Sequence, residues 1–142
     1  MRSLQHPDEL DALLAALAAE RDRLAKQQGK RVPLAVKVAP DLDEYGIEAI
    51  ADRVAARGID AVIATNTTVS RDGVGHLPAS REPGGLSGAP LKALATAVVR
   101  RLRRQKLDAG ADLVQLYTAL VYRGPGLVGE IVRGLASQGR VR

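Results

Sequence analysis

Helical and strand-like hydrophobic patterns alternate along this 142-residue chain, and the alternation limits the folds available to it. Apolar residues recurring every three or four positions predict amphipathic helices over residues 7–28 and 43–57, from Pro90, and from Pro125. Short apolar runs predict strands over residues 33–39, 60–66 and 112–118. Strands separated by helices pair in parallel, so we expect an α/β fold built on a parallel sheet or barrel.

Polar side chains stand at or near the carboxyl end of each predicted strand. They are Lys37 in the first, Thr65 with Asn66 after the second, and Tyr117 with Thr118 after the third. Parallel α/β folds bind ligands beyond the carboxyl ends of their strands. One polar strand end is usually only a turn, but three in the same register predict a shared pocket. The loop over residues 71–89, rich in glycine and proline, is too long for a simple connection.

The composition argues against several kinds of site. The chain has no cysteine, so it forms neither a disulfide nor a thiolate metal site. Its two histidines, His6 and His76, lack the spacing of metal ligands, so we expect no metal. No apolar run approaches the roughly 20 residues that cross a bilayer, and the first residues lack a signal-peptide core. A cytoplasmic location is therefore expected.

The net charge of +5 raises the question of nucleic-acid binding. The densest basic run is RRLRRQK, residues 100–106, at the end of a predicted helix. Single-strand binders place aromatic side chains among their cations, and this chain has three Tyr and no Phe or Trp. Cations also oppose the negative carboxyl end of a helix, which favours a solvated face over a nucleic-acid patch. We therefore expect no nucleic-acid partner.

Four segments together resemble the C-terminal half of the quinone-linked dihydroorotate dehydrogenases. They read AVKVAPDL, VIATNTT, GGLSGAPL and AGADLVQLYTALVYRGPGLV, and the resemblance runs from about Leu4 to Ala136. Members of that family are FMN-containing (β/α)8 barrels that oxidise dihydroorotate to orotate in pyrimidine biosynthesis. The resemblance implies a partial TIM barrel with FMN as cofactor and with dihydroorotate, orotate and quinone as partners.

The resemblance assigns FMN binding to Lys37, Thr65, Gly88, Tyr117 and Thr118. A fixed ammonium group would favour hydride acceptance, because reduced flavin accumulates negative charge at its pyrimidine end. A position inside an apolar strand argues against Lys37 being a surface lysine. At Gly88 the backbone would approach the cofactor, which requires the absence of a Cβ atom, although glycine is also common in turns. Backbone N–H groups at Tyr117 and Thr118 would hold the flavin phosphate, and a packing role for Tyr117 is compatible with this.

Asn66 and Thr67 match the pair of family residues that binds the substrate. An amide donates and accepts hydrogen bonds at once, which suits the imide edge of orotate. The alternative is that these residues only cap a turn.

The chain also departs from the family pattern. A complete barrel takes about 250 residues, which three strands cannot close. The family's serine base and the N-terminal helices that place it on the cytoplasmic or inner membrane would lie upstream of Met1, so no catalytic residue is expected here. The apolar stripe of the third helix loses its phase near Gln105 and Lys106. The family has a further strand and a phosphate loop there, so we predict one partial flavin-barrel domain over 1–142 that lacks this segment.

Two classes of function remain open for the chain. It is either part of a quinone-linked dihydroorotate dehydrogenase, or a non-catalytic copy that is inactive alone. Apolar strands with unpaired edges seek partners, so we also expect the chain to self-associate.

Overall fold

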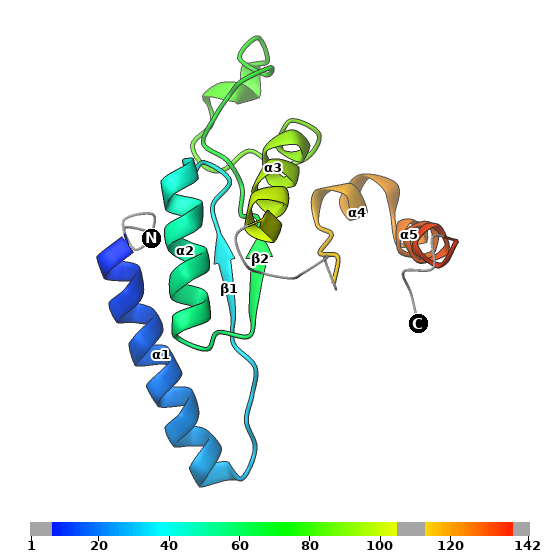
Figure 1. The fold of residues 1–142 in the computed structure, drawn as a ribbon. Helices are drawn as coiled ribbons and strands as arrows, with labels where there is room; N and C mark the ends of the chain where they lie inside the picture. The colour runs from blue at the N-terminus through cyan, green and yellow to red at the C-terminus, as the bar shows by residue number, and fades with distance from the viewer. Residues whose placement is uncertain (1–6, 105–112, 138–142) are drawn as a thin grey trace. The chain divides into compact units, whose positions relative to one another are not determined.

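The computed structural model describes residues 7–104 and 113–137 and divides the chain into two compact units, residues 1–110 and 111–142. The elements of unit 1 follow in chain order (Figure 1): α1 (Pro7–Gln28), β1 (Ala35–Val38), α2 (Glu44–Ala56), β2 (Ala61–Ala64), the 3-10 helix η2 (Pro78–Arg81) and α3 (Leu91–Arg104). Unit 2 contains α4 (Thr118–Arg123) and α5 (Gly126–Ala136). The predicted alternation of helices and strands is confirmed for unit 1.

The two strands of unit 1 pair in parallel, with Ala35 opposite Ala61 and Val38 opposite Ala64. α2 makes the crossover between them, as expected for a β-α-β unit. The sheet of the described residues has these two strands and is not closed. The α/β class with parallel strands is therefore confirmed for unit 1.

Alternation along the strands separates a helix-covered face from an open face. Val36 and Val38 of β1, with Val62 and Ala64 of β2, pack against the helices, because successive side chains of a strand point to opposite faces. All three helices contribute to the same core: its buried members outside the strands are Leu10, Leu14, Ile47, Ile50, Ala51, Val54, Ile59, Val98 and Leu102.

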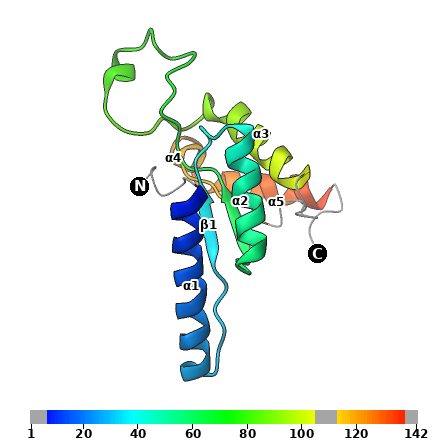
Figure 2. The same cartoon turned by 60° about the vertical axis from the view of Figure 1, so that its left-hand side comes forward.

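The predicted start of α2 is confirmed at Asp43. Its carboxylate accepts a hydrogen bond of 2.7 Å from the backbone N–H of Gly46, which satisfies one of the N–H groups left free at a helix start. The loop after β2 extends beyond the carboxyl ends of both strands, as Figures 1 and 2 show from two directions.

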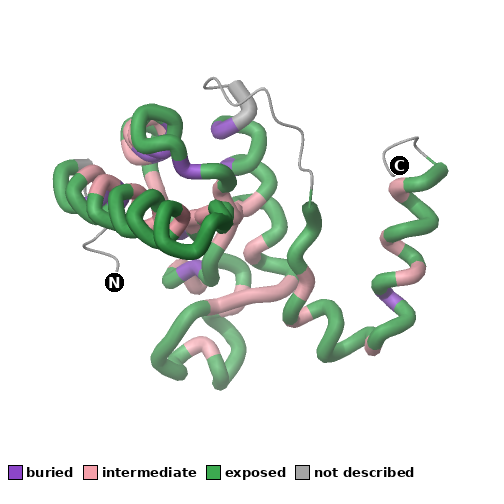
Figure 3. Tube along the Cα trace, turned by 90° about the horizontal axis from the view of Figure 1, so that it is seen from below, coloured by how far each residue is buried: buried purple, intermediate pink, exposed green. Residues whose placement is uncertain are grey.

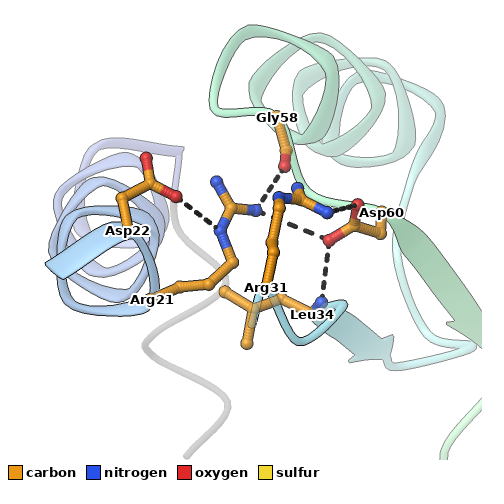
Figure 4. Close-up of polar contacts among 6 residues, drawn as sticks. All are labelled: Arg21, Asp22, Arg31, Leu34, Gly58 and Asp60. Atoms are coloured by element: carbon orange, nitrogen blue, oxygen red, sulfur yellow. Dashed lines mark hydrogen bonds and ion pairs between the residues drawn. The ribbon is translucent and has the colours of Figure 1, made fainter. Parts of the chain in front are cut away.

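The opposite, amino end of the sheet is fixed by charges around Asp60 (Figure 4). The Asp60 carboxylate accepts hydrogen bonds from Arg31 Nη1 at 2.7 Å, from the Leu34 N–H at 2.8 Å and from Arg21 Nη1 at 3.4 Å. Arg21 also donates to the Gly58 carbonyl at 2.7 Å, which ties α1 to the end of α2. The hydrogen bond from Arg31, followed by that from the Leu34 N–H, lowers the pKa of Asp60 below its ordinary value.

Unit 2 differs from the prediction in its first segment. The strand expected over residues 112–118 is wrong for residues 113–116, to which the structure assigns no strand, and Asp112 lies outside the described residues. A strand needs a hydrogen-bonding neighbour, and the described residues of unit 2 offer none. Leu127 is the one buried residue within 113–137, and Figure 3 shows this segment as largely exposed.

Two kinds of feature are absent from the part of the chain that the structure describes. None of its helices has the length and hydrophobicity of a membrane span. Its His, Asp and Glu side chains form no group of three or more that could hold a metal ion. The predicted missing segment between residues 105 and 106 falls within residues 105–112, which lie outside the described residues.

Candidate functional site

The carboxyl ends of β1 and β2 bring the first two groups of candidate residues together. Lys37 stands opposite Ile63 in the strand register. The chain continues this pairing one step further, because the Asn66 N–H donates to the Val38 carbonyl at 2.7 Å. Lys37 and Asn66 therefore lie at the same end of the sheet, as the sequence predicts. The pocket that they would share with Tyr117 stays a prediction, because Tyr117 belongs to unit 2.

Lys37 is exposed in this structure, contrary to the expectation that an apolar strand would enclose it. Its neighbours Val36 and Val38 face the helices, so Lys37 points to the other face of the sheet. In a closed barrel that face is the interior, whereas here it is open. The ammonium group is therefore available to a ligand on the open face.

The four polar residues after β2 divide into two roles. Thr65 is half-buried and donates from its hydroxyl to the Asn66 carbonyl at 2.9 Å. Asn66 and Thr67 are exposed, so their side chains are available to a ligand. Thr68 is only 1% exposed and is a structural residue.

Thr68 links the two strand ends through Asp41, a residue that the sequence analysis did not single out. The Thr68 hydroxyl donates to Asp41 Oδ1, and Asp41 Oδ2 accepts a 3.3 Å bond from the Val69 N–H. The Thr68 oxygen also accepts from the Ser70 N–H at 3.0 Å. Asp41 follows β1 directly after Pro40, and an acidic residue so close to a strand end is the signal that could have identified it.

The far end of the long loop after β2 returns to the carboxyl end of that strand. Thr68 and Leu86 exchange two backbone hydrogen bonds, of 3.0 and 2.8 Å, in an isolated antiparallel bridge. Gly85 then lies directly against Thr67: a Cβ atom added to it would stand 1.9 Å from Thr67 Oγ1 and 2.4 Å from Thr67 Cβ. Only glycine fits this approach without displacement. The bridge brings residues from both sides of the loop to the strand end.

Gly88, the candidate flavin contact, follows two residues after the bridge and is half-buried. Its φ of 85° lies in the left-handed region, which a residue with a Cβ atom rarely adopts. A glycine requirement at this position thus has a backbone cause, whether or not a ligand approaches.

Tyr117 and Thr118 lie at the start of α4 in unit 2. Tyr117 is 81% exposed, and its carbonyl accepts from the N–H groups of Leu120 and Val121 at 3.0 and 3.2 Å. Thr118 is half-buried and is the first residue of the helix. The sequence analysis did not predict this helix, and residues 113–116 before it form no strand.

A family model and individual relatives match this chain. The model described as dihydroorotate dehydrogenase matches residues 1–106. A "Dihydroorotate dehydrogenase (quinone)" of Bordetella avium is 48% identical over 161 residues, covering 99% of this chain and 46% of the relative. One of Thiobacillus denitrificans is 50% identical over 157 residues, covering 96% of this chain and 47% of the relative. The chain thus spans about half the length of these curated relatives.

Solved structures agree with the sequence relatives. A ligand-free DHODH from Eimeria tenella, 32% identical, superposes with a TM-score of 0.86 over 100% of this chain and 49% of the other. The same enzyme in complex with ferulenol, 30% identical, gives a TM-score of 0.83 over 97% and 47%.

The match to one relative is longer than this chain. The match to the Bordetella avium relative extends over 161 positions, whereas this chain has 142 residues. At least 19 positions of that match therefore hold no residue of this chain (161 less 142).

Proposed function

Since this chain belongs to the quinone-linked dihydroorotate dehydrogenase family, we propose that it carries part of the FMN and substrate sites of such an enzyme. The reaction is the two-electron oxidation of dihydroorotate to orotate, with a quinone as final acceptor. The observation that supports this best is the meeting of Lys37 and the Thr65–Thr67 segment at one end of a parallel sheet. That end is where ligands bind in α/β barrels.

The residues present fit FMN, the cofactor that the family uses. When bound, FMN supplies the acceptor for a hydride. Lys37 offers a cation on the open face, which would stabilise negative charge at the flavin. Thr65 would add a hydroxyl, and the bare backbone at Gly88 would allow close approach. In unit 2, backbone N–H groups at Tyr117 and Thr118 would hold the phosphate.

Asn66 and Thr67 would bind dihydroorotate and orotate. Both are exposed, whereas the hydroxyl of the neighbouring Thr68 is already hydrogen-bonded to Asp41. The Asn66 amide can donate to a ring carbonyl and accept from a ring N–H, which matches an imide edge. The Thr67 hydroxyl would add one further donor or acceptor, so the pair orients the substrate without taking its protons.

A second proposal concerns the 142 residues by themselves: they do not turn over. The sheet of the described residues has two strands, and at least 19 positions of the Bordetella avium match have no counterpart here. The family's serine base has no match in the chain either. These observations support the prediction of a missing strand and phosphate loop between residues 105 and 106, and hence a weak grip on FMN.

Ligand titration tests the first proposal. We expect saturable binding of orotate to the purified chain, weakened by N66A and T67V, and saturable binding of FMN, weakened by K37Q. The matched controls are T96V and K92Q, because Thr96 and Lys92 are exposed residues of α3. Failure of the wild type to bind either ligand, or equal losses in the controls, would refute the assignment.

An activity assay tests the second proposal. The chain is mixed with FMN, dihydroorotate and a soluble quinone, and orotate formation is followed. We expect no rate above the protein-free blank. Steady turnover would show that the chain is complete enough for catalysis.

A further inference from the structure

The loop between Thr68 and Leu86 is organised by one side chain, Arg71. Its guanidinium group donates to five backbone carbonyls of the loop. These are Ser80 at 3.0 Å from Nε, Val69 at 3.2 Å and Ser70 at 3.4 Å from Nη1, and Glu82 at 3.1 Å and Gly84 at 2.8 Å from Nη2. The Arg71 side chain thereby connects the two sides of the loop, residues 69–70 and residues 80–84.

This pattern uses the full capacity of arginine. A guanidinium group has five N–H donors in a planar fork, so five carbonyls can be satisfied at once. Lysine has three donors at a single point and could not reach the same set. The hydrogen-bond partners of Arg71 among the described residues are carbonyl groups and no carboxylates, so its function in this loop is to order backbone rather than to neutralise charge.

Apolar packing contributes little to the shape of the loop. A half-open pocket of about 160 Å³ lies beside Arg71 and is lined by Val74, Leu77 and Pro83 among others. Leu77 is 46% exposed. A loop that surrounds an open pocket depends on its hydrogen bonds for a fixed shape, because close packing is missing there.

The hydrogen bonds of Arg71 hold the backbone that contacts Thr67. The shortest of them holds the Gly84 carbonyl, and the next residue, Gly85, has its backbone against the Thr67 side chain. The backbone of residues 84 and 85 therefore forms one wall beside the Thr67 hydroxyl. If this wall moves, Thr67 gains rotamer freedom that the present arrangement denies it.

We propose that Arg71 is a positioning residue for substrate binding, which fixes the Thr67 side chain by holding the Gly84–Gly85 backbone against it. Arg71 itself touches no substrate. The proposal rests on the proposed function in one respect, the assignment of Thr67 to orotate. Its geometric part, the control of Thr67 by Arg71, stands on the hydrogen bonds alone.

The first experiment measures the geometry without ligand. The full chain is compared with R71K, which keeps the charge, and with R81K as matched control. Arg81 lies in the same loop, and its side chain makes no hydrogen bond or ion pair with another described residue. We expect the nuclear Overhauser contact between the Thr67 methyl group and Gly85 to be lost in R71K and kept in R81K. Its survival in R71K would overturn the proposal.

Proteolysis gives an independent measure of the same loop. Thermolysin cuts on the amino side of leucine, the Gly85–Leu86 bond follows the exposed Gly85, and neither variant alters that site. Cleavage there should be about tenfold faster in R71K, because the loop opens locally, and unchanged in R81K. Equal cleavage rates in R71K and wild type would contradict the claim that Arg71 holds the loop in place.

The last experiment uses a double-mutant cycle to connect the hydrogen bonds of Arg71 with orotate binding. Orotate affinity should fall about tenfold in R71K, since misplacement by about 1 Å commonly costs at least that much. T67V should bind as weakly as T67V/R71K, because Arg71 acts through Thr67. Additive losses would refute the positioning role. Absence of orotate binding in the wild type would instead refute the assignment of Thr67, and the Overhauser contact would then decide the role of Arg71.

Discussion

Replacing Thr68 by valine removes one hydroxyl from a closed site and keeps the shape of the side chain. Thr68 is 1% exposed, so the valine methyl enters a space that water does not reach. The substitution breaks the bond to the Asp41 carboxylate and leaves the Ser70 N–H without its acceptor. No cavity is created, and the effect reports hydrogen bonding alone.

The magnitude follows from the exposure of the partners. A hydrogen bond to a charged group contributes about 1.5–3 kcal/mol, and an unsatisfied buried group costs a similar amount. Asp41 is exposed, so water recovers part of that loss at the carboxylate. We therefore expect T68V to lower the free energy of unfolding by about 1–2 kcal/mol.

Equilibrium urea unfolding, followed by circular dichroism, measures this change. With a slope of about 1.5 kcal/mol per molar urea, the midpoint of T68V should fall by about 1 M. T67V is the control: Thr67 is exposed, and its substitution should change stability by less than about 0.5 kcal/mol. In a D41A background the T68V effect should shrink, because the partner is gone. Equal stability of T68V and T67V would refute the claim that Thr68 anchors the strand ends.

Three further predictions concern the rest of unit 1 and the whole chain. The pKa of Asp60 is lowered from its ordinary 3.8, so its stabilisation is present above that pH and is lost as pH falls through the lower folded value. The urea midpoint of D60N should therefore vary less between pH 5 and 3 than the midpoint of the wild type. The same pH dependence in both proteins would contradict the role of the arginine partners of Asp60. L14A should cost about 2–5 kcal/mol, because Leu14 is 1% exposed, against a much smaller cost for L17A at 43% exposure. Light scattering after size-exclusion chromatography should find the chain self-associated, with a melting temperature that FMN raises little; a sharply melting monomer strongly stabilised by FMN would contradict both expectations.

Local patterns predicted much of unit 1. The observed bounds of α1 match the expected ones, because a long amphipathic stripe depends only on near neighbours. The start of α2 at residue 43 was predicted for the same reason. The strands are shorter than their apolar runs, since Pro33 and Leu34 precede the paired register. The family resemblance that these segments carried is also confirmed.

The partners within the site could not be predicted in this way. Thr68 and Asp41 are 27 residues apart, and their bond follows from the parallel pairing of β1 and β2. Arg71 looks in sequence like any loop cation, and only the returning chain reveals the five carbonyls around it. Gly85 likewise resembles a turn residue until Thr67 is placed beside it.

Residues 112–118 show why an apolar run can be read correctly as a family feature and wrongly as a strand. A strand is defined by its neighbours, because its N–H and C=O groups must find partners on another strand. Within the described residues of unit 2 no such partner exists, and Leu113 is left 91% exposed. β1 and β2 avoid this outcome because α2 brings them side by side and α1 and α3 join the core that covers their inner face. The pattern in the sequence therefore reflects the barrel of the family, whereas the strands that the described residues pair are those of unit 1. Adding the neighbouring strands of a family member should convert residues 113–116 into a strand without any change in their sequence.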